Sequence, residues 1–420
     1  MDVEIKETTR KDGLRIITCN IPTQTKVSVE ISALIGSVQD PVDKQGLFHY
    51  FEHMAFKGTK KRTAKDIRDF ANRNLLSFNA STSRLRTEYY GVAVYKKLSK
   101  VCDIISDIYV NSNFPQKEIN KEKGPVLLEA ARNKDSDSYI ADLTLRELLY
   151  AKNPLRQFST GTEEGIKSIT RKDLLREKER WYVPSNTVVL AVGRVSHSGF
   201  VREMEHRIPV NHERVIRSVW DSEFDLPLLK NRHVIERGDR RQSTVLMGCK
   251  VPEKISDRMD IVEDFLLSLL VSGWSSRLWR EVREKRGLAY SAGGGVSRMY
   301  NLGAYFNAIA QTKPGKEKLV ESLMRKAIFT PITSKDKKIF EDTRETMNDR
   351  ITAGFGESLD SWGSLIYEKI IKGESLPNPK RYLKTQRDIV NSLSLREAEK
   401  MRRELFKPDR FATVIVKPKK

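Results

Sequence analysis

The spacing of apolar and polar residues changes along the first part of the chain, and each pattern predicts a different kind of element. Alternation with a period of two at residues 27–35 is typical of a strand with one face in the core. Four strands are predicted from alternation and β-branched composition, at 14–19, 27–35, 78–83 and 88–94. Helical spacing is predicted at roughly 44–57, 64–74 and 97–150. Runs of strands and helices that do not strictly alternate favour an α+β fold.

A later part of the chain repeats one of these patterns. Residues 165–192 align with residues 389–416 without a gap, and apolar positions coincide although few residues are identical. Both segments begin with a helix capped by Ser or Thr, turn at a proline (Pro184 or Pro408) and end in a β-branched strand. Helix–turn–strand units can resemble one another generically. The matching length, order and turn position nevertheless favour a duplicated chain.

The length of 420 residues is sufficient for two domains that each bury a core. We therefore expect an N-terminal domain at 1–210 and a homologous C-terminal domain at 230–420. The linker is placed at 211–229, in a stretch punctuated by Pro and Asn.

The formal net charge of +20 raises the question of a nucleic-acid ligand. The basic excess is spread over both halves, and we find no zinc finger, phosphate-binding glycine loop or RNA-binding aromatic signature. We therefore expect no nucleic-acid partner; the alternative, a basic nucleic-acid-binding protein, predicts salt-sensitive retention on DNA or RNA. The longest apolar runs are too short to span a bilayer, so no membrane association is expected.

Cysteine usage indicates a reducing compartment. Cys19, Cys102 and Cys249 are widely separated, and no pair has C-x-x-C spacing. This pattern gives neither a disulfide framework nor a thiolate zinc site. Residues 1–6 lack the apolar core of a signal peptide, and their acidic residues are unlike a transit peptide. We therefore expect a cytoplasmic protein.

The most informative motif is His49-Tyr50-Phe51-Glu52-His53. In a helix, His49 and His53 lie one turn apart on one face, so both imidazoles can bind one Zn²⁺. Glu52 lies beside them and can transfer a proton. This H-x-x-E-H order is the reverse of the H-E-x-x-H zinc peptidase motif. The chain has only 6 histidines, and the other interpretation is a partly buried helix face with ordinary histidines.

A catalytic zinc with two imidazoles and a water needs a third protein ligand, usually a His, Asp or Glu distant in sequence. Glu122 and Glu129 are seven residues apart, hence on one face of the predicted helix, and they flank the apolar residues 126–128. Spacing alone selects neither acid, and a solvated helix face is the simpler explanation of both.

Residues 46–59, GLFHYFEHMAFKGT, resemble the signature of the pitrilysin-type zinc metallopeptidases, which include insulin-degrading enzymes and the mitochondrial processing peptidase. The resemblance extends over nearly the whole chain. It implies that Glu129 joins the two histidines of the motif in binding one Zn²⁺ per chain. It further implies that Glu52 is the general base and that Glu122 supports the ligands from outside.

Two further segments resemble substrate-binding parts of the family. Asn79 and Ala80 match an edge strand that pairs with the substrate, although the glycines that often precede this pair are missing at 74–78. The sequence from Arg283 to Tyr290 is similar to the family's Arg/Tyr segment. The resemblance implies that these two residues hold the substrate and help to stabilise the tetrahedral oxyanion.

The resemblance implies a zinc endopeptidase that hydrolyses peptides or unfolded polypeptide segments inside a closed chamber. Four domains enclose the chamber in the family, and this chain would supply two, as half of a clamshell. Each is expected to be a mainly antiparallel sheet covered by helices. We expect a homodimer rather than a heterodimer with a related subunit, because the zinc motif and the Arg/Tyr segment both occur here. The alternative is a catalytically silent scaffold or partner subunit of the same family.

Overall fold

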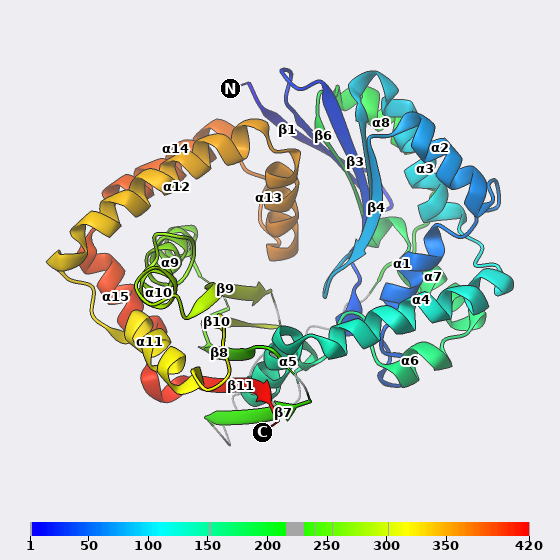
Figure 1. Ribbon diagram of the computed structural model, residues 1–420. Coiled ribbons are helices and arrows are strands. Elements are labelled where there is room, and N and C mark those ends of the chain that lie inside the picture. The colour runs from blue at the N-terminus through cyan, green and yellow to red at the C-terminus, as the bar shows by residue number, and fades with distance from the viewer. Residues whose placement is uncertain are drawn as a thin grey trace. The chain divides into compact units, whose positions relative to one another are not determined.

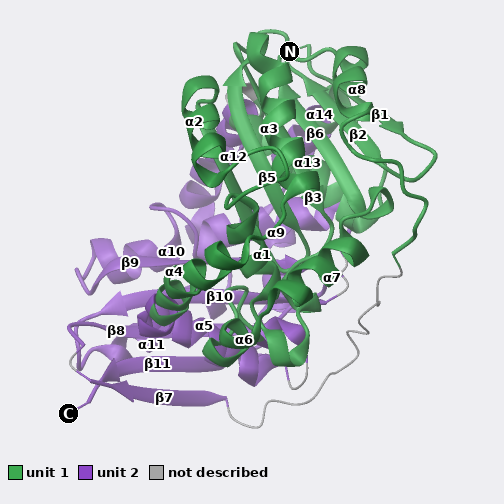
Figure 2. Cartoon of the chain, turned by 90° about the vertical axis from the view of Figure 1, so that its right-hand side faces the viewer, with its two compact units in different colours: residues 1–131, 157–218, 354–382 green, residues 132–156, 219–353, 383–420 purple. Residues whose placement is uncertain are grey.

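The computed structural model describes residues 2–150, 153–215, 231–238, 240–253, 255–300 and 302–419. The chain forms two compact units, coloured separately in Figure 2, and neither unit is continuous in sequence. Unit 1 comprises residues 1–131, 157–218 and 354–382, and unit 2 comprises residues 132–156, 219–353 and 383–420. The predicted linker 211–229 lies outside the described residues from residue 216 onward.

Unit 1 is built on a six-stranded sheet with the order β1-β2-β6-β3-β5-β4. Its strands are β1 (Glu4–Thr9), β2 (Arg15–Asn20), β3 (Lys26–Ala33), β4 (Ser77–Thr82), β5 (Thr87–Val94) and β6 (Thr187–Gly193). Only β2 and β6 pair in parallel, and the other pairs are antiparallel. Strand β4 lies at one edge of this sheet.

The sheet of unit 2 repeats this topology. Its strands are β7 (Arg232–Arg237), β8 (Ser243–Lys250), β9 (Ala289–Met299), β10 (Gly303–Thr312) and β11 (Ala412–Pro418). Their order is β7-β11-β8-β10-β9, which matches β2-β6-β3-β5-β4 strand for strand. The pair β7 and β11 is parallel, as is the pair β2 and β6. The common order and direction confirm the predicted duplication and the predicted α+β class.

Helices cover both sheets. In unit 1 the main helices are α1 (Leu47–Ala55), α2 (Ala64–Asn74), α3 (Leu98–Asn111), α4 (Gln116–Asp135), α6 (Glu163–Ser168), α7 (Arg171–Trp181), α8 (His197–Glu205) and α13 (Leu359–Lys372). In unit 2 they are α5 (Asp137–Leu149), α9 (Asp257–Leu270), α10 (Arg277–Trp279), α11 (Glu317–Phe329), α12 (Lys337–Glu357), α14 (Pro379–Ser392) and α15 (Leu395–Leu405). The chain passes between the units within the last turn of α4, after residue 131, and within the first turn of α14, after residue 382.

Successive side chains of β3 point to opposite faces of the unit 1 sheet. Val27, Val29 and Ile31 are fully buried in the core on the face that α3 covers. Ser28 and Glu30 point to the opposite face, where α13 lies (Figure 1). The period of two in the sequence therefore corresponds to one face packed on α1 and α3 and one face covered by α13.

Each half of the chain supplies one helix to the other unit. Helix α5 contacts β8 and β11 of unit 2, and helix α13 contacts β6 of unit 1. The predicted domains 1–210 and 230–420 are contiguous, whereas residues 132–156 belong to unit 2 and residues 354–382 to unit 1. Periodicity predicted helix over residues 132–150 but did not indicate which sheet that helix covers, and we made no sequence prediction for residues 354–382.

The four predicted strands correspond to β2, β3, β4 and β5. The helical stretch predicted over 97–150 is divided into α3, α4 and α5. The first break includes Phe114, whose φ of 48° is incompatible with a continuous right-handed helix. The second is at Ser136, whose side chain caps α5 by accepting a hydrogen bond from the backbone of Tyr139.

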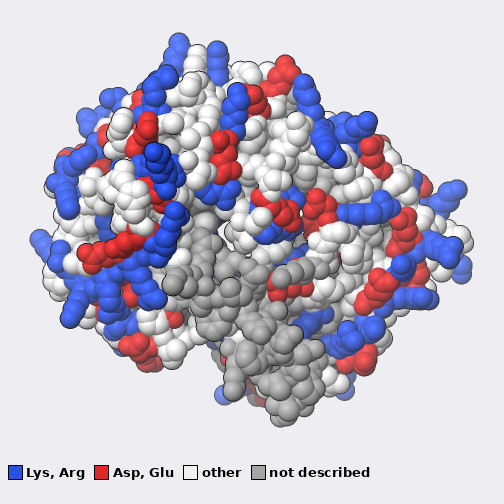
Figure 3. All heavy atoms as spheres, turned by 180° about the vertical axis from the view of Figure 1, so that it is seen from behind, with Lys and Arg blue, Asp and Glu red and all other residues white. Residues whose placement is uncertain are grey.

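The expectations about membrane-spanning helices and about the distribution of basic residues can be compared with the structure. Within the described part of the chain, none of the helices combines the length and the apolar character needed to cross a membrane. On the face shown in Figure 3, Lys and Arg side chains are interspersed with Asp and Glu over many elements.

Candidate metal centre

Helix α1 carries both histidines of the motif, and the preceding loop fixes where it starts. Gly46 is the N-cap and has a φ of 96°, a left-handed conformation that favours glycine. Asp40 accepts hydrogen bonds from the backbone N–H groups of Gly46 at 2.7 Å and Phe48 at 3.0 Å. It thereby satisfies donors that the first turn leaves unpaired. Burial raises the pKa of Asp40 to about 7, although the backbone hydrogen bonds act to lower it.

Two buried contacts orient α1 within unit 1. The hydroxyl of Tyr50 donates to the carbonyl of Ile119 at 2.5 Å, which joins α1 to α4. The ring of Phe51 stacks on that of Tyr182, with 4.5 Å between the ring centres. Tyr50 and Phe51 face the core, and His49, one residue before Tyr50, and His53, two residues after Phe51, are directed toward α4.

His49, His53 and Glu129 converge at this point. Nε2 of His49 lies 3.4 Å from Oε1 of Glu129, and Nε2 of His53 lies 3.4 Å from Oε2. One ligand atom of each residue lies within 4.8 Å of the other two, and this is the one such group found among the described residues. Two imidazole nitrogens and a carboxylate oxygen are the donor set of catalytic zinc sites that keep one position for water. The three side chains therefore fit a zinc ion.

The charge balance of the cluster favours the ionised carboxylate that a metal requires. A hydrogen bond from His49, together with the proximity of both imidazoles, lowers the pKa of Glu129. Metal ligation needs a deprotonated carboxylate, so this environment prepares Glu129 for binding.

Glu122 orients His53 from outside the cluster. Its Oε1 lies 3.1 Å from Nδ1 of His53, and its Oε2 lies 2.6 Å from Nζ of Lys57. Burial acts to raise the pKa of Glu122, but hydrogen bonds from His53 and Lys57 outweigh burial and lower the pKa. A carboxylate that accepts from Nδ1 directs Nε2 toward the metal position. Nδ1 of His49, by contrast, is buried with no hydrogen-bond partner in the described part of the chain.

Glu52 lies between the two histidines in sequence and contacts the sheet. Its Oε2 accepts a hydrogen bond from Oγ1 of Thr82 at 2.8 Å. Burial raises the pKa of Glu52, while the hydrogen bond from Thr82 and the neighbouring imidazoles act to lower it. A partly desolvated carboxylate next to a metal position is well suited to accept a proton.

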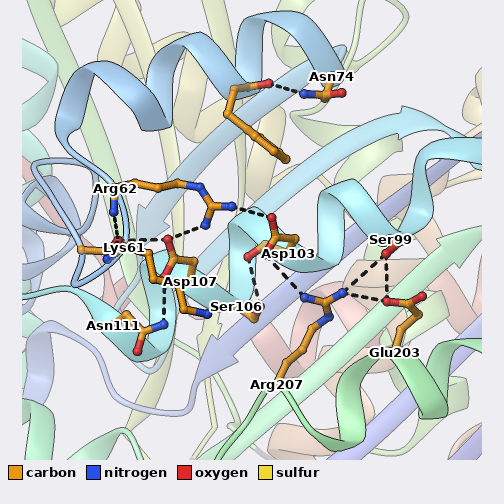
Figure 4. Close-up of polar contacts among 12 residues, drawn as sticks. Lys61, Arg62, Asn74, Ser99, Asp103, Ser106, Asp107, Asn111, Glu203 and Arg207 are labelled. Carbon is orange, nitrogen blue, oxygen red and sulfur yellow. Dashed lines mark hydrogen bonds and ion pairs between the residues drawn. The ribbon is translucent and has the colours of Figure 1, made fainter.

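Ion pairs tie the segment that follows α1 to helix α3, as Figure 4 shows. The guanidinium of Arg62 lies 2.6 Å from Asp107 and 2.5 Å from Asp103. The hydroxyl of Thr59 donates to Asp107 at 2.9 Å. Lys57 belongs to the same segment. This network therefore helps to fix the position of the Lys57 ammonium group, which contacts Glu122.

Asn79 and Ala80 lie in β4, at the edge of the unit 1 sheet. The side chain of Asn79 is exposed, whereas that of Ala80 is buried in the core of unit 1. The sheet order leaves one side of β4 without a neighbouring strand among the described residues, so its backbone groups can accept a further strand.

Arg283 and Tyr290 lie in unit 2 and contact one another. The guanidinium of Arg283 lies 5.1 Å from the centre of the Tyr290 ring, and it donates to the carbonyl of Ala289 at 3.2 Å. The side chain of Tyr290 is 78% exposed at the start of β9. That Arg283 and Tyr290 contact a substrate bound at the metal ligands of unit 1 stays a prediction.

Sequence reasoning did not identify three residues that contact the site: Asp40, Lys57 and Thr82. Lys57 lies within residues 46–59, the segment that resembles the family signature, so the resemblance could have indicated it. No sequence pattern indicates Asp40 or Thr82, because Asp40 reaches α1 through a loop that folds back and Thr82 reaches it from a strand distant in sequence.

Two family models match the chain in succession. The model described as insulinase (peptidase family M16) matches residues 15–163, and the model described as the peptidase M16 inactive domain matches residues 168–335. The first match contains all three candidate metal ligands, and the second contains the Arg283–Tyr290 segment.

Similar proteins are named for the same family. An uncharacterized zinc protease of Rickettsia bellii is 30% identical over 321 residues, which cover 76% of this chain and 76% of that protein. An uncharacterized zinc protease of Bacillus subtilis is 26% identical and covers 99% of this chain and 98% of its own length. The solved structure of a protease from Helicobacter pylori has the same fold, with a TM-score of 0.85 at 21% identity over 99% of this chain and 100% of that one. The chain therefore belongs to the M16, or insulinase, family of peptidases.

Proposed function

We propose that this chain is a zinc-dependent endopeptidase that hydrolyses peptides or unfolded polypeptide segments. The observation that carries the proposal is the convergence of His49, His53 and Glu129, with a partly buried carboxylate, Glu52, on the same helix. Two relatives are named zinc proteases, which supports zinc as the metal. We propose one Zn²⁺ per chain.

The ligands and the base have separate tasks. His49, His53 and Glu129 would hold the zinc, which when bound would supply a Lewis acid to polarise the scissile carbonyl and to make water more acidic. Glu52 accepts a proton from the attacking water at its carboxylate and transfers it to the leaving amine. Glu122 and Lys57 keep the imidazole of His53 in the orientation that the ligand needs.

Substrate binding is proposed to use the edge of the unit 1 sheet. An extended peptide would add a strand beside Asn79 and Ala80, so that backbone hydrogen bonds position it with little demand on its sequence. In a homodimer that encloses a chamber, Arg283 and Tyr290 would hold the peptide and stabilise the oxyanion. The exposure of Tyr290 supports a role in contacting a ligand.

The cytoplasm is the proposed compartment. The three cysteines are free and buried, which supports a chain that folds without disulfides.

The proposal is tested by elemental analysis together with cleavage of a quenched peptide library. We expect stoichiometric zinc, turnover by the wild type, and loss of turnover in Glu52→Gln with zinc retained. Glu164→Gln, a matched charge change at an exposed position of α6, is the control and is expected to keep full activity. Stoichiometric zinc with no turnover in the wild type would instead identify a catalytically silent partner subunit.

A further inference from the structure

Thr82 lies where the edge strand of unit 1 meets the zinc helix. It is the last residue of β4 and pairs in register with Thr87 of β5. Its Oγ1 lies 2.8 Å from Oε2 of Glu52 and 3.3 Å from the carbonyl oxygen of Phe48. One side chain of the strand proposed to receive the substrate therefore contacts the proposed general base.

The direction of the hydrogen bond follows from the groups involved. An ionised carboxylate can only accept, so the hydroxyl of Thr82 donates its single proton to Glu52, and the shorter of its two contacts is to this carboxylate. A hydrogen bond to a charged acceptor is stronger than one between neutral groups. It engages Oε2 alone, so it restrains rotation of the carboxylate and leaves Oε1 to receive a proton.

The backbone around Thr82 is itself held in place. Ser83 follows Thr82 and closes the β4–β5 hairpin through a backbone hydrogen bond to Arg86 at 2.8 Å. The N–H of Ser37 donates to the carbonyl of Ser83 at 3.1 Å. A Cβ at Gly36 would lie only 2.4 Å from this carbonyl oxygen, so glycine permits the close approach of the two segments. Thr82 is thus fixed relative to the core of unit 1, and its hydroxyl has a defined position.

We propose that Thr82 is a positioning residue that sets the orientation of the Glu52 carboxylate and couples it to β4. This inference rests on the proposed peptidase function. It assigns β4 a second task beyond pairing with a peptide, because the same strand orients the proton acceptor. A change at Thr82 then acts on the chemical step, whereas a change in strand pairing acts on substrate binding.

The test compares Thr82→Val, which removes the hydroxyl at nearly constant volume, with Thr82→Ser, which keeps it. Thr87→Val is the matched control, because Thr87 is the register partner in the same hairpin and its hydroxyl donates to Ile35 rather than to Glu52. The wild type and the three variants are to be compared in kcat and KM on one quenched peptide, in zinc content, and in the Glu52 rotamer seen in their crystal structures.

In Thr82→Val we expect kcat to fall about 10- to 100-fold with KM and zinc content unchanged, the loss expected for a hydrogen bond to a charged group. Thr82→Ser and Thr87→Val are expected to retain kcat within a few-fold. In crystals of Thr82→Val the Glu52 carboxylate should occupy more than one orientation. Unchanged kcat in Thr82→Val, an effect on KM instead of kcat, or equal losses in the Val and Ser variants would overturn the inference.

The crystallographic comparison separates this inference from the proposed function. If the wild type cleaves no peptide, the proposed function fails, and the orientation of Glu52 in Thr82→Val still decides whether Thr82 positions it. A single unchanged Glu52 rotamer in that variant overturns the positioning role even if the wild type is an active peptidase.

Discussion

Nζ of Lys57 lies 2.6 Å from Oε2 of Glu122, so a cation outside the metal cluster balances the carboxylate that orients His53. The side chain of Glu122 is almost fully buried, and a buried carboxylate without a counter-charge is costly. Lys57 thus forms an ion pair with Glu122, and Glu122 in turn contacts His53, which is a candidate metal ligand.

Replacing Lys57 by Met is expected to weaken zinc binding without removing a ligand. Loss of the ammonium group leaves Glu122 uncompensated and His53 less well oriented, and we expect the zinc affinity to fall about 10- to 100-fold. Competition with a chromogenic chelator measures the change. Lys60→Met removes an exposed charge from the same segment and serves as the control. Equal affinities in the two variants would contradict the role of Lys57.

Glu129→Gln tests the third ligand. The amide keeps the shape of the side chain but replaces an anionic oxygen by a neutral one, and zinc sites favour charged carboxylate donors. We expect the zinc content after gel filtration to fall below about one-tenth of that of the wild type. Glu118→Gln, on the same helix, is expected to keep stoichiometric zinc. A Glu129→Gln protein that retains zinc would show that the metal does not use this side chain.

Two glycines of unit 1 are expected to respond to alanine in opposite ways. Gly46 has a φ of 96°, and an added Cβ would lie 2.8 Å from the carbonyl oxygen of Thr160, so Gly46→Ala is strained and crowded. We expect its free energy of unfolding to fall by about 1–2 kcal/mol or more. Gly354 lies inside α12, where an added Cβ would lie 4.0 Å from Oγ of Ser361, an ordinary van der Waals distance. Gly354→Ala should raise the free energy of unfolding by about 0.5–1 kcal/mol. Denaturant unfolding measures both.

The buried carboxyl group of Asp40 predicts a dependence of stability on pH. Burial raises its pKa from 3.8 to about 7 in the folded protein, so the folded state binds the proton more tightly than the unfolded state does. The favourable contribution is fully present below about pH 4 and is lost as the pH rises toward 7.

Asp40→Asn removes this titration and is expected to flatten the fall in unfolding free energy between about pH 4 and 7. The slope, rather than the absolute stability, is the quantity to compare, because Asn also changes the hydrogen bonds to Gly46 and Phe48. Parallel curves for the metal-free wild type and variant would mean that Asp40 does not titrate in this range.

The sequence predicted those parts of the site that depend on local geometry. His49 and His53 are one helical turn apart in any helix, so their shared face needed no tertiary information. Glu129 is different, because only the docking of α4 on α1, through contacts such as that of Tyr50 with Ile119, brings it to the histidines. Residue spacing could not select it among the acids of the chain, and the family resemblance could.

The cap of α1 illustrates what local rules miss. An N-cap is ordinarily sought in the residue directly before the helix, and Gly46 has no side chain to serve. The acceptor is Asp40, six residues before Gly46 in sequence, and it reaches the helix only because the intervening loop folds back. A capping motif spread over a loop has no fixed spacing, so the sequence could not predict it.

The exchange of α5 and α13 bears on how such a chain could have arisen. A half-length ancestor with this topology would have left one face of its sheet without its covering helix. In a domain-swapped dimer of that ancestor, each copy would have covered the open face of the other copy's sheet with its own helix. Fusion of two such copies into one gene would then have fixed the exchange within a single chain. Cutting the present chain in the middle should therefore yield two fragments that fold together and not apart.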